Sequence, residues 1–216
     1  EKRLEAFVRM AHAIVVFPGG VGTAEEILYI LGILLSPGNE SMQLPLLLTG
    51  PRSSEAYFRQ LHEFVGATLG PEAQARYAIL LGDPQRGAKV VSCGLEDVRE
   101  FRAKNDDAYF FNWMLSIRPE FQQTFEATHE NMAALDLHRD QPTHQLAVSL
   151  RRAFSGIVAG NVRESGVRLV EEHGPFELHG DPAVVESLGG LLKDFVSQRR
   201  MRLSDLLGYV PCYRSE

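Results

Sequence analysis

Cysteine is scarce in this sequence, and long apolar runs are missing. Only two cysteines occur among the 216 residues, Cys93 and Cys212, and their spacing is not that of metal ligands. We therefore expect reduced thiols in a cytoplasmic protein. No apolar stretch approaches the roughly 18 residues of a membrane-spanning helix, and no signal-peptide pattern opens the chain. Contact with a membrane is not expected.

Positive charge is also in deficit. Lysine and arginine number 22 against 28 aspartates and glutamates, which leaves a formal net charge of -6. This balance argues against nonspecific binding of nucleic acid. Hydrophobic residues make up 44% of the chain, which is enough for the core of one large domain or two small ones.

The standard phosphate-binding fingerprints are absent. The chain has no G-x-x-x-x-G-K-[ST], and G-x-G-x-x-G fails because Glu25 stands at the third glycine position. What is present is P-G-G-V-G-T-A-E-E at residues 18–26, between a β-like run at 14–17 and a helical run at 27–35. Glycines allow positive φ and close approach to a ligand, and helix-start amides bind anions. The stretch predicts a strand, a glycine turn that accepts phosphate, and a helix.

Thr23 and Glu26 within this stretch have two interpretations. Thr-x-x-Glu at a helix start is typical of a capping box, in which both side chains satisfy backbone amides. The alternative is a catalytic or ligand-binding role. The glycines favour this alternative, because a cap needs none of them.

Helix and strand patterns alternate along the first half of the chain. We expect strands at 14–17, 44–49 and 77–81, and helices at 1–13, 27–35, 54–69 and 84–92. This order predicts an α/β fold with a Rossmann-like, doubly wound parallel sheet. So few strands do not make a stable sheet of this kind, so we expect further strands upstream in a longer protein. A mainly helical region follows, with helices at 141–168 and 182–202 and a short strand within 174–181.

Arg3 is expected beside the glycine turn. The helix at 1–13 runs down from the carboxyl edge of the sheet and the strand at 14–17 returns to it. Ligands of open α/β sheets bind at this edge. The alternative for Arg3 is a solvated surface residue.

Arg3 and the glycine stretch together resemble a known family. An arginine near a helix start followed by P-G-G-x-G-T-x-x-E is similar to the signature of the LOG-like family, formerly labelled lysine decarboxylases. The matching residues are Arg3, Pro18, Gly19, Gly20, Gly22, Thr23 and Glu26. The chain departs from the family at Lys2 and Leu4, where many relatives have Arg-Lys, and it lacks the family's upstream glycine-rich phosphate segment.

The second half extends the resemblance to the two-domain bacterial pyrimidine/purine nucleotide 5′-monophosphate nucleosidases. The similar segments are D-A-Y at 107–109, H-E-N-M at 129–132, L-R-R-A-F-S-G-I-V-A-G-N-V at 150–162 and P-C-Y at 211–213. The resemblance implies a nucleotide-binding catalytic domain at 1–93, a connector at 94–125 and a mainly helical accessory domain at 126–216. It also implies a homo-oligomer and regulation by a guanosine alarmone.

The activity implied by this resemblance is hydrolysis of the N-glycosidic bond of a nucleoside 5′-monophosphate, without a cofactor. Glu26 would stabilise the oxocarbenium-like sugar and activate water, tasks suited to a carboxylate kept ionised at a helix start. Arg3 would supply positive charge near phosphate or ribose. The phosphate itself would be held by Gly19, Gly20, Gly22 and Thr23.

Two other functions stay open on the sequence. A nucleotide-binding sensor would use the same glycines without turnover. A pyridoxal-phosphate decarboxylase needs a Schiff-base lysine. The lysines of the chain are Lys2, Lys89, Lys104 and Lys193, and none has a persuasive setting.

Further polar residues lie outside the glycine stretch. His129 and Asn131 are candidates for nucleotide contact across a domain interface, or for hydrogen bonds at a helix start. Zinc is not expected, because H-E-x-x-H fails at residue 133. Two groups of arginines could receive a multiply phosphorylated regulator: Arg151 with Arg152, and Arg199, Arg200 and Arg202. Solvated helix faces or ion pairs are their alternative.

Overall fold

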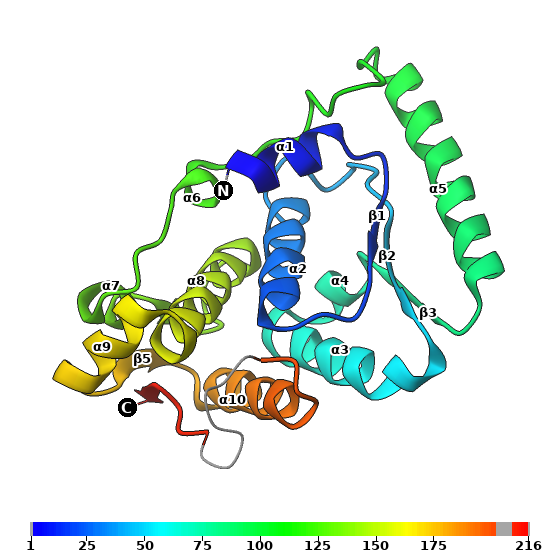
Figure 1. The fold of residues 1–216 in the computed structure, drawn as a ribbon. Helices are drawn as coiled ribbons and strands as arrows, with labels where there is room; N and C mark the ends of the chain where they lie inside the picture. The colour runs from blue at the N-terminus through cyan, green and yellow to red at the C-terminus, as the bar shows by residue number, and fades with distance from the viewer. Residues whose placement is uncertain (1, 202–208, 216) are drawn as a thin grey trace.

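The protein is an α/β structure with two small parallel sheets (Figure 1). The computed structural model describes residues 2–201 and 209–215. Each sheet has three strands, in the order β1-β2-β3 and β4-β5-β6. Helices surround both sheets and fill the space between them.

The first sheet agrees with the alternation in the sequence. Its strands are β1 (Ile14–Val16), β2 (Leu46–Gly50) and β3 (Ala78–Leu81), all parallel. The helices of this half are α1 (Lys2–Met10), α2 (Val21–Leu34), α3 (Glu55–Leu69) with the turn η1 (Arg52–Ser54) before it, α4 (Pro71–Gln74) and α5 (Pro84–Lys104). The predicted parallel strands are thus confirmed.

Helix α2 is central to the molecule. Every residue from Ile27 to Leu34 is buried, so the helix is enclosed on all sides and not amphipathic. It lies between the first sheet and α8 (Thr143–Val162) (Figure 1). The close packing of the two helices depends on Gly32, where a Cβ would lie 2.6 Å from the ring of Phe121 and 3.1 Å from Ala147.

The second half is helical, but it also holds a sheet that the sequence showed only in part. Its strands are β4 (Asp136–Leu137), β5 (Phe176–Gly180) and β6 (Tyr213–Ser215). Its helices, besides α8, are α6 (Pro119–Gln122), α7 (His129–Ala133), α9 (Glu164–His173) and α10 (Pro182–Ser197). Of the three strands, only β5 was predicted, because two or three residues are too few to show a strand period.

One hydrophobic core runs through both halves. Aromatic side chains join them edge to face, with ring centroids 5.6 Å apart for Phe64 and Phe154 and 5.8 Å apart for Tyr29 and Phe121. Two glycines of α8 permit close approach of neighbouring side chains. A Cβ at Gly156 would lie 2.1 Å from the sulfur of Met132, and one at Gly160 would lie 2.8 Å from that of Cys212.

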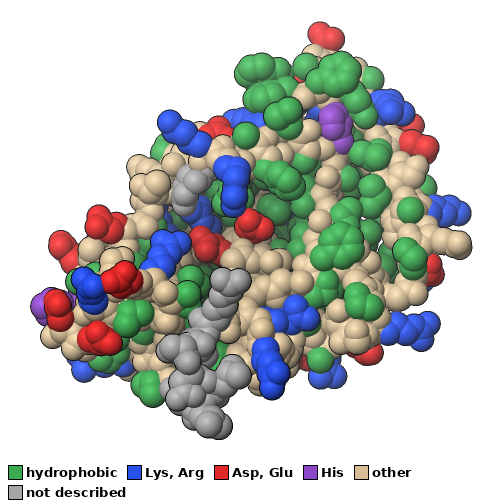
Figure 2. Space-filling view, in the orientation of Figure 1, with side chains coloured by type: hydrophobic (Ala, Val, Ile, Leu, Met, Phe, Trp, Pro, Cys, Tyr) green, Lys and Arg blue, Asp and Glu red, His purple; other side chains and the backbone are tan. Residues whose placement is uncertain are grey.

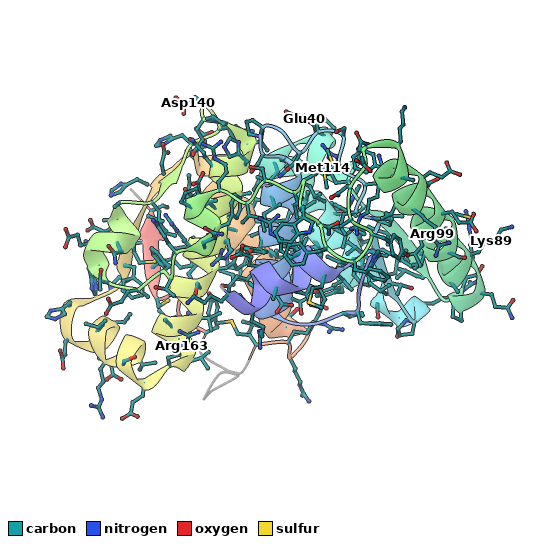
Figure 3. The ribbon with its side chains drawn as sticks, turned by 90° about the horizontal axis from the view of Figure 1, so that it is seen from above. Glu40, Lys89, Arg99, Met114, Asp140 and Arg163 are labelled. Carbon is teal, nitrogen blue, oxygen red and sulfur yellow. The ribbon has the colours of Figure 1, made fainter. Side chains whose placement is uncertain are left out.

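Helix α5 is longer than expected and is mostly exposed. It continues to Lys104, and only Gly87, Val98 and Arg102 are buried along it. Figure 3 shows Lys89 at the outer edge of the molecule. The predicted connector at 94–125 therefore begins within this helix.

Both cysteines are free thiols, Cys93 on the surface and Cys212 in the core. Burial raises the pKa of the Cys212 thiol to about 12. Within the described part of the chain, no helix has the length and apolar character that crossing a bilayer requires.

Candidate active site

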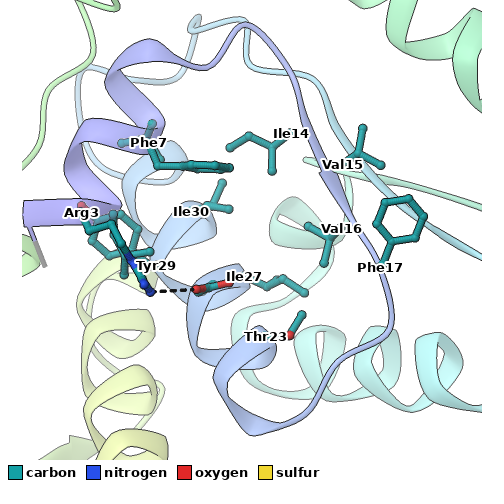
Figure 4. Close-up of a pocket in the computed structure, with 13 residues that line it drawn as sticks. Arg3, Phe7, Ile14, Val15, Val16, Phe17, Thr23, Ile27, Tyr29 and Ile30 are labelled. Carbon is teal, nitrogen blue, oxygen red and sulfur yellow. Dashed lines mark ion pairs between the residues drawn. The ribbon is translucent and has the colours of Figure 1, made fainter.

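A cavity of about 490 Å³ opens between α1, β1 and α2 (Figure 4). This volume lies in the range of small-molecule sites. Its polar lining comes from Arg3, Thr23 and Glu26, and its walls are mainly hydrophobic, including Phe7 and Ile30. On the surface, Figure 2 shows basic and acidic side chains together at the edge of a hollow with hydrophobic walls. The cavity thus combines an apolar body with charges at its mouth.

Arg3 and Glu26 face each other at this mouth. The Nη2 atom of Arg3 lies 3.8 Å from Oε1 of Glu26, and the side chains are 89% and 50% exposed (Figure 4). An ion pair this exposed contributes about 0–1 kcal/mol to stability. The distance is too long for a hydrogen bond, so both groups keep their hydrogen-bonding capacity for a ligand. Arg3 thus lines the same cavity as Thr23 and Glu26 of the glycine stretch.

Helix α1, which carries Arg3, is held at its other end by Asn112. The side-chain amide of Asn112 donates to the carbonyl oxygens of Val8 at 2.7 Å and Ala11 at 3.0 Å. In return, the guanidinium of Arg9 donates to the carbonyl of Asn112 at 2.8 Å. These bonds satisfy carbonyls at the end of α1, which helices leave without internal partners.

The capping-box interpretation of Thr23 and Glu26 is wrong. Helix α2 begins at Val21 with Gly20 as its N-cap, and no side chain caps it. The Gly20 carbonyl accepts the backbone amides of Thr23 at 3.1 Å and Ala24 at 3.3 Å. Thr23 is therefore already inside the helix, and its side chain lines the cavity.

The position of Glu26 also differs from the expectation. It lies in the second turn of α2, and the helix macrodipole acts mainly within the first turn. The positive charge close to its carboxylate is therefore that of Arg3, not that of the helix end.

The glycines of the turn allow neighbouring atoms to pack closely against the backbone. None of them adopts a left-handed conformation. Positive φ is found at Gly38, Gly70, Gly82 and Gly174, and not in the glycine stretch. A Cβ at Gly19 would lie 1.9 Å from Oγ1 of Thr23, and one at Gly20 would lie 2.1 Å from the carbonyl oxygen of Arg200. At Gly22 a Cβ would have no neighbour within 4 Å among the atoms the structure places. Gly22 therefore leaves open space at the start of α2.

His129 and Asn131 lie on α7, and the structure does not bring them to the cavity. The ring Nε2 of His129 is 2.9 Å from the carbonyl oxygen of Gly174, and the side-chain amide of Asn131 donates to that of Glu126 at 2.9 Å. Both contacts hold the chain around the start of α7, as the helix-start alternative predicts.

Arg151 and Arg152 differ in their surroundings. Arg151 is buried between α8 and α2, 3.9 Å from Glu25, and its guanidinium lies over the ring of Tyr29 at 5.2 Å. Since Tyr29 lines the cavity, Arg151 supports the cavity wall from behind. Arg152 lies over the ring of Phe125 at 5.9 Å and donates to the Glu120 carbonyl at 3.3 Å. Of the other arginines singled out, Arg202 lies outside the described residues.

Arg200 lies next to the site, and no sequence motif predicted that position. Its guanidinium donates to the carbonyl oxygen of Gly19 at 3.1 Å, across 181 positions of sequence. No periodicity or local spacing reveals a contact of that separation.

No metal site accompanies these residues. Within residues 2–201 and 209–215, histidine, cysteine, aspartate and glutamate side chains form no group of three or more that could hold an ion.

Comparison with known proteins identifies the family. The family model described as pyrimidine/purine nucleotide monophosphate nucleosidase, C-terminal, matches residues 95–215. The chain belongs to this nucleosidase family. A second model, described as possible lysine decarboxylase, matches residues 1–89. This matched region includes the glycine stretch at residues 18–26.

Curated relatives of this nucleosidase-family chain carry a matching name. Proteins named pyrimidine/purine nucleotide 5′-monophosphate nucleosidase from Escherichia coli strain K12 and from Escherichia coli O157:H7 are each 53% identical to it over 213 residues. The match covers 99% of this chain and 47% of each relative, so the chain spans about half their length.

Proposed function

We propose that this chain contributes the catalytic carboxylate and the phosphate-binding turn of a nucleosidase. The reaction is hydrolysis of the N-glycosidic bond of purine and pyrimidine nucleoside 5′-monophosphates to free base and ribose 5-phosphate. The observation that carries the proposal is the cavity in which Arg3, Thr23 and Glu26 meet beside the start of α2. The substrate class is the one in the names of the relatives.

The start of α2 is the proposed phosphate site. The first amides of a helix have no carbonyl partner within it and point outward, where they bind anions. Gly19 and Gly20 shape the turn that precedes these amides, and the space beside Gly22 leaves room for phosphate oxygens. The hydroxyl of Thr23 adds a donor from the side of the cavity.

Glu26 is the proposed catalytic carboxylate. Cleavage of the glycosidic bond develops positive charge at the anomeric carbon, which a nearby carboxylate stabilises. The same group can accept a proton from the attacking water. Arg3 at 3.8 Å balances this negative charge before the substrate enters, and it contacts phosphate or ribose afterwards. The apolar walls at Phe7 and Ile30 suit the base and the sugar face.

The remaining parts of the proposal concern the whole protein. Strands β1–β3 belong to a Rossmann-like, doubly wound sheet within a catalytic domain at 1–93, and a connector at 94–125 joins it to an accessory domain at 126–216. The protein acts in the cytoplasm without a cofactor, in keeping with its free thiols. A homo-oligomer is supported by the exposed aromatic residues Phe110 and Trp113, 81% and 69% accessible.

Regulation by a guanosine alarmone would depend on Arg152 more than on Arg151. Arg151 is buried against Glu25, so a surface-bound phosphate would meet Arg152 first. His129 and Asn131 take part only if the segment around α7 rearranges, because both are held by backbone carbonyls.

The deciding experiment measures release of base and ribose 5-phosphate from AMP, GMP, IMP, CMP and UMP by the full-length natural protein. We expect release with the native protein, loss of most of it in Glu26→Gln, and no effect of Glu63→Gln, an exposed carboxylate on α3. Release that persists in Glu26→Gln would remove Glu26 from its catalytic role. Nucleotide binding without release in the native protein would identify a sensor instead.

A further inference from the structure

The end of α10 reaches the glycine turn through Arg200. The guanidinium Nη1 donates to the carbonyl oxygen of Gly19 at 3.1 Å. The backbone carbonyl oxygen of the same arginine lies so close to Gly20 that a Cβ there would be 2.1 Å from it. The two residues that Arg200 contacts, Gly19 and Gly20, immediately precede α2. Arg200 therefore contacts the turn with its side chain and its backbone.

A defined helix ending places Arg200 there. The amide of Arg199 donates to the Val196 carbonyl at 2.9 Å and the amide of Arg200 donates to the Phe195 carbonyl at 2.7 Å. Arg199 has a φ of 55°, in the left-handed region. This pair of bonds around a left-handed residue is the Schellman motif. It turns the chain sharply after α10 and directs Arg200 toward the turn.

The Arg200 side chain is held on both sides. Its guanidinium lies 4.6 Å from the centre of the Tyr57 ring, and that ring stacks on Phe195 with centroids 5.6 Å apart. Its Nε donates to the side-chain oxygen of Gln198 at 3.1 Å, and Gln198 donates to Gln60 on α3 at 2.6 Å. A guanidinium stacked on an aromatic ring and hydrogen-bonded at its edge is fixed in one orientation.

We propose that Arg200 is a positioning residue for the phosphate-binding turn, holding the Gly19 carbonyl so that the amides at the start of α2 face the 5′-phosphate. This inference rests on the proposed function. A peptide group presents its carbonyl and its amide in opposite directions, because it is planar and trans. Fixing the Gly19 carbonyl on Arg200 therefore fixes the Gly20 amide on the other side of the same peptide. Without Arg200 the turn has more conformations, and phosphate must select one of them.

The test compares Arg200→Met with Arg200→Lys in the full-length natural protein. Methionine keeps much of the stem but cannot donate to Gly19, whereas lysine retains a charge and a donor without the planar fork. We expect Arg200→Met to raise KM for the nucleotide about tenfold or more. The inhibition constant of inorganic phosphate should rise by the same factor, while kcat changes by no more than about threefold. Arg200→Lys should fall between Arg200→Met and the native protein.

A control variant separates positioning from general stability. Arg168→Met removes an arginine from α9 that pairs with Glu164 on the surface, and it should change neither KM nor phosphate inhibition. An Arg200→Met protein with native KM and native phosphate inhibition would overturn the inference, as would an equal loss in kcat and kcat/KM with KM unchanged.

The outcome stays informative if the proposed activity is wrong. Binding of inorganic phosphate to the native protein and to Arg200→Met can be followed by calorimetry without any turnover. Native binding that weakens in the variant supports the role of Arg200 even in a sensor. Equal binding by both proteins, or no phosphate binding by the native protein, would refute it.

Discussion

Arg151 on α8 and Glu25 on α2 form an ion pair inside the protein, with 3.9 Å between Nε and Oε1. The side chains are only 3% and 24% exposed. Glu25 is the neighbour of Glu26, and the guanidinium also covers Tyr29 in the cavity wall. The helical second half of the chain therefore holds the helix of the proposed catalytic carboxylate in place.

Replacing Arg151 by methionine should destabilise the fold. Removal of one member of a buried ion pair costs about 3–5 kcal/mol. Because Glu25 is a quarter exposed, we expect the lower end of this range in the free energy of unfolding from urea titration. The double variant Arg151→Met/Glu25→Gln should recover part of the loss. Arg168→Met, in an exposed pair, should cost less than about 1 kcal/mol, and an equal cost for both arginines would contradict the assignment.

Arg3 should matter for activity and hardly for stability. Its side chain is 89% exposed and its pair with Glu26 is long, so Arg3→Met should change the free energy of unfolding by less than about 1 kcal/mol. Loss of a charged donor to the substrate should nevertheless lower kcat/KM about 100-fold or more. Arg59→Met, another exposed arginine that pairs with a glutamate, is the matched control. Native kcat/KM in Arg3→Met would exclude Arg3 from the site.

Gly22 gives a test of the empty space beside the turn. An alanine Cβ there would have no neighbour within 4 Å among the described residues, and alanine is favoured over glycine inside a helix by about 1 kcal/mol. Gly22→Ala should therefore keep or raise the melting temperature, yet weaken binding of nucleotide and of inorganic phosphate. Gly190→Ala on α10, also with no neighbour within 4 Å, should give a similar melting temperature and native binding. Unchanged binding in Gly22→Ala would mean that phosphate lies elsewhere.

The sequence predicted those elements whose pattern is local and strong. Strand β1 and the apolar length of α2 follow from uninterrupted hydrophobic runs, and Arg3 was placed beside the turn from topology alone. The start of α2 was wrong because Val21–Ala24 include residues with weak helix preference, and because Thr23 suggested a cap. Here the Gly20 carbonyl accepts the first hydrogen bonds of the helix. A backbone contact of this kind cannot be predicted from a pattern of side chains.

What the sequence missed depends on contacts between distant segments. For Arg151 the sequence left open a regulator contact, a solvated helix face or an ion pair. The structure shows an ion pair with Glu25, and its burial depends on the packing of α8 on α2. Arg200 meets Gly19 only after both halves have folded together. Strands β4 and β6 exist because β5 pairs with them, not because of their own composition. Tertiary context decides such features.

His144 on α8 should make stability depend on pH. Burial first, and the nearby charge of Arg118 second, lower the pKa of His144 below its usual 6.5, while Glu120 opposes them. Its Nε2 is buried without a hydrogen-bond partner among the residues described. Below about pH 6.5 the unfolded chain therefore binds a proton that the folded chain does not, and stability falls as the pH falls. Above that pH the histidine is neutral in both states and contributes no pH dependence.

The size of this effect is measured by comparing urea unfolding at about pH 7 and about pH 5.5. One proton bound only by the unfolded chain costs at most about 1.4 kcal/mol per pH unit. The native protein should lose more stability over this interval than His144→Gln, which is uncharged throughout. Carboxylates such as Glu120, whose pKa is lowered in the folded protein, also destabilise the fold at acid pH, but they do so in both proteins. Equal losses in the native protein and in His144→Gln would show that His144 takes up its proton in the folded state as readily as in the unfolded chain.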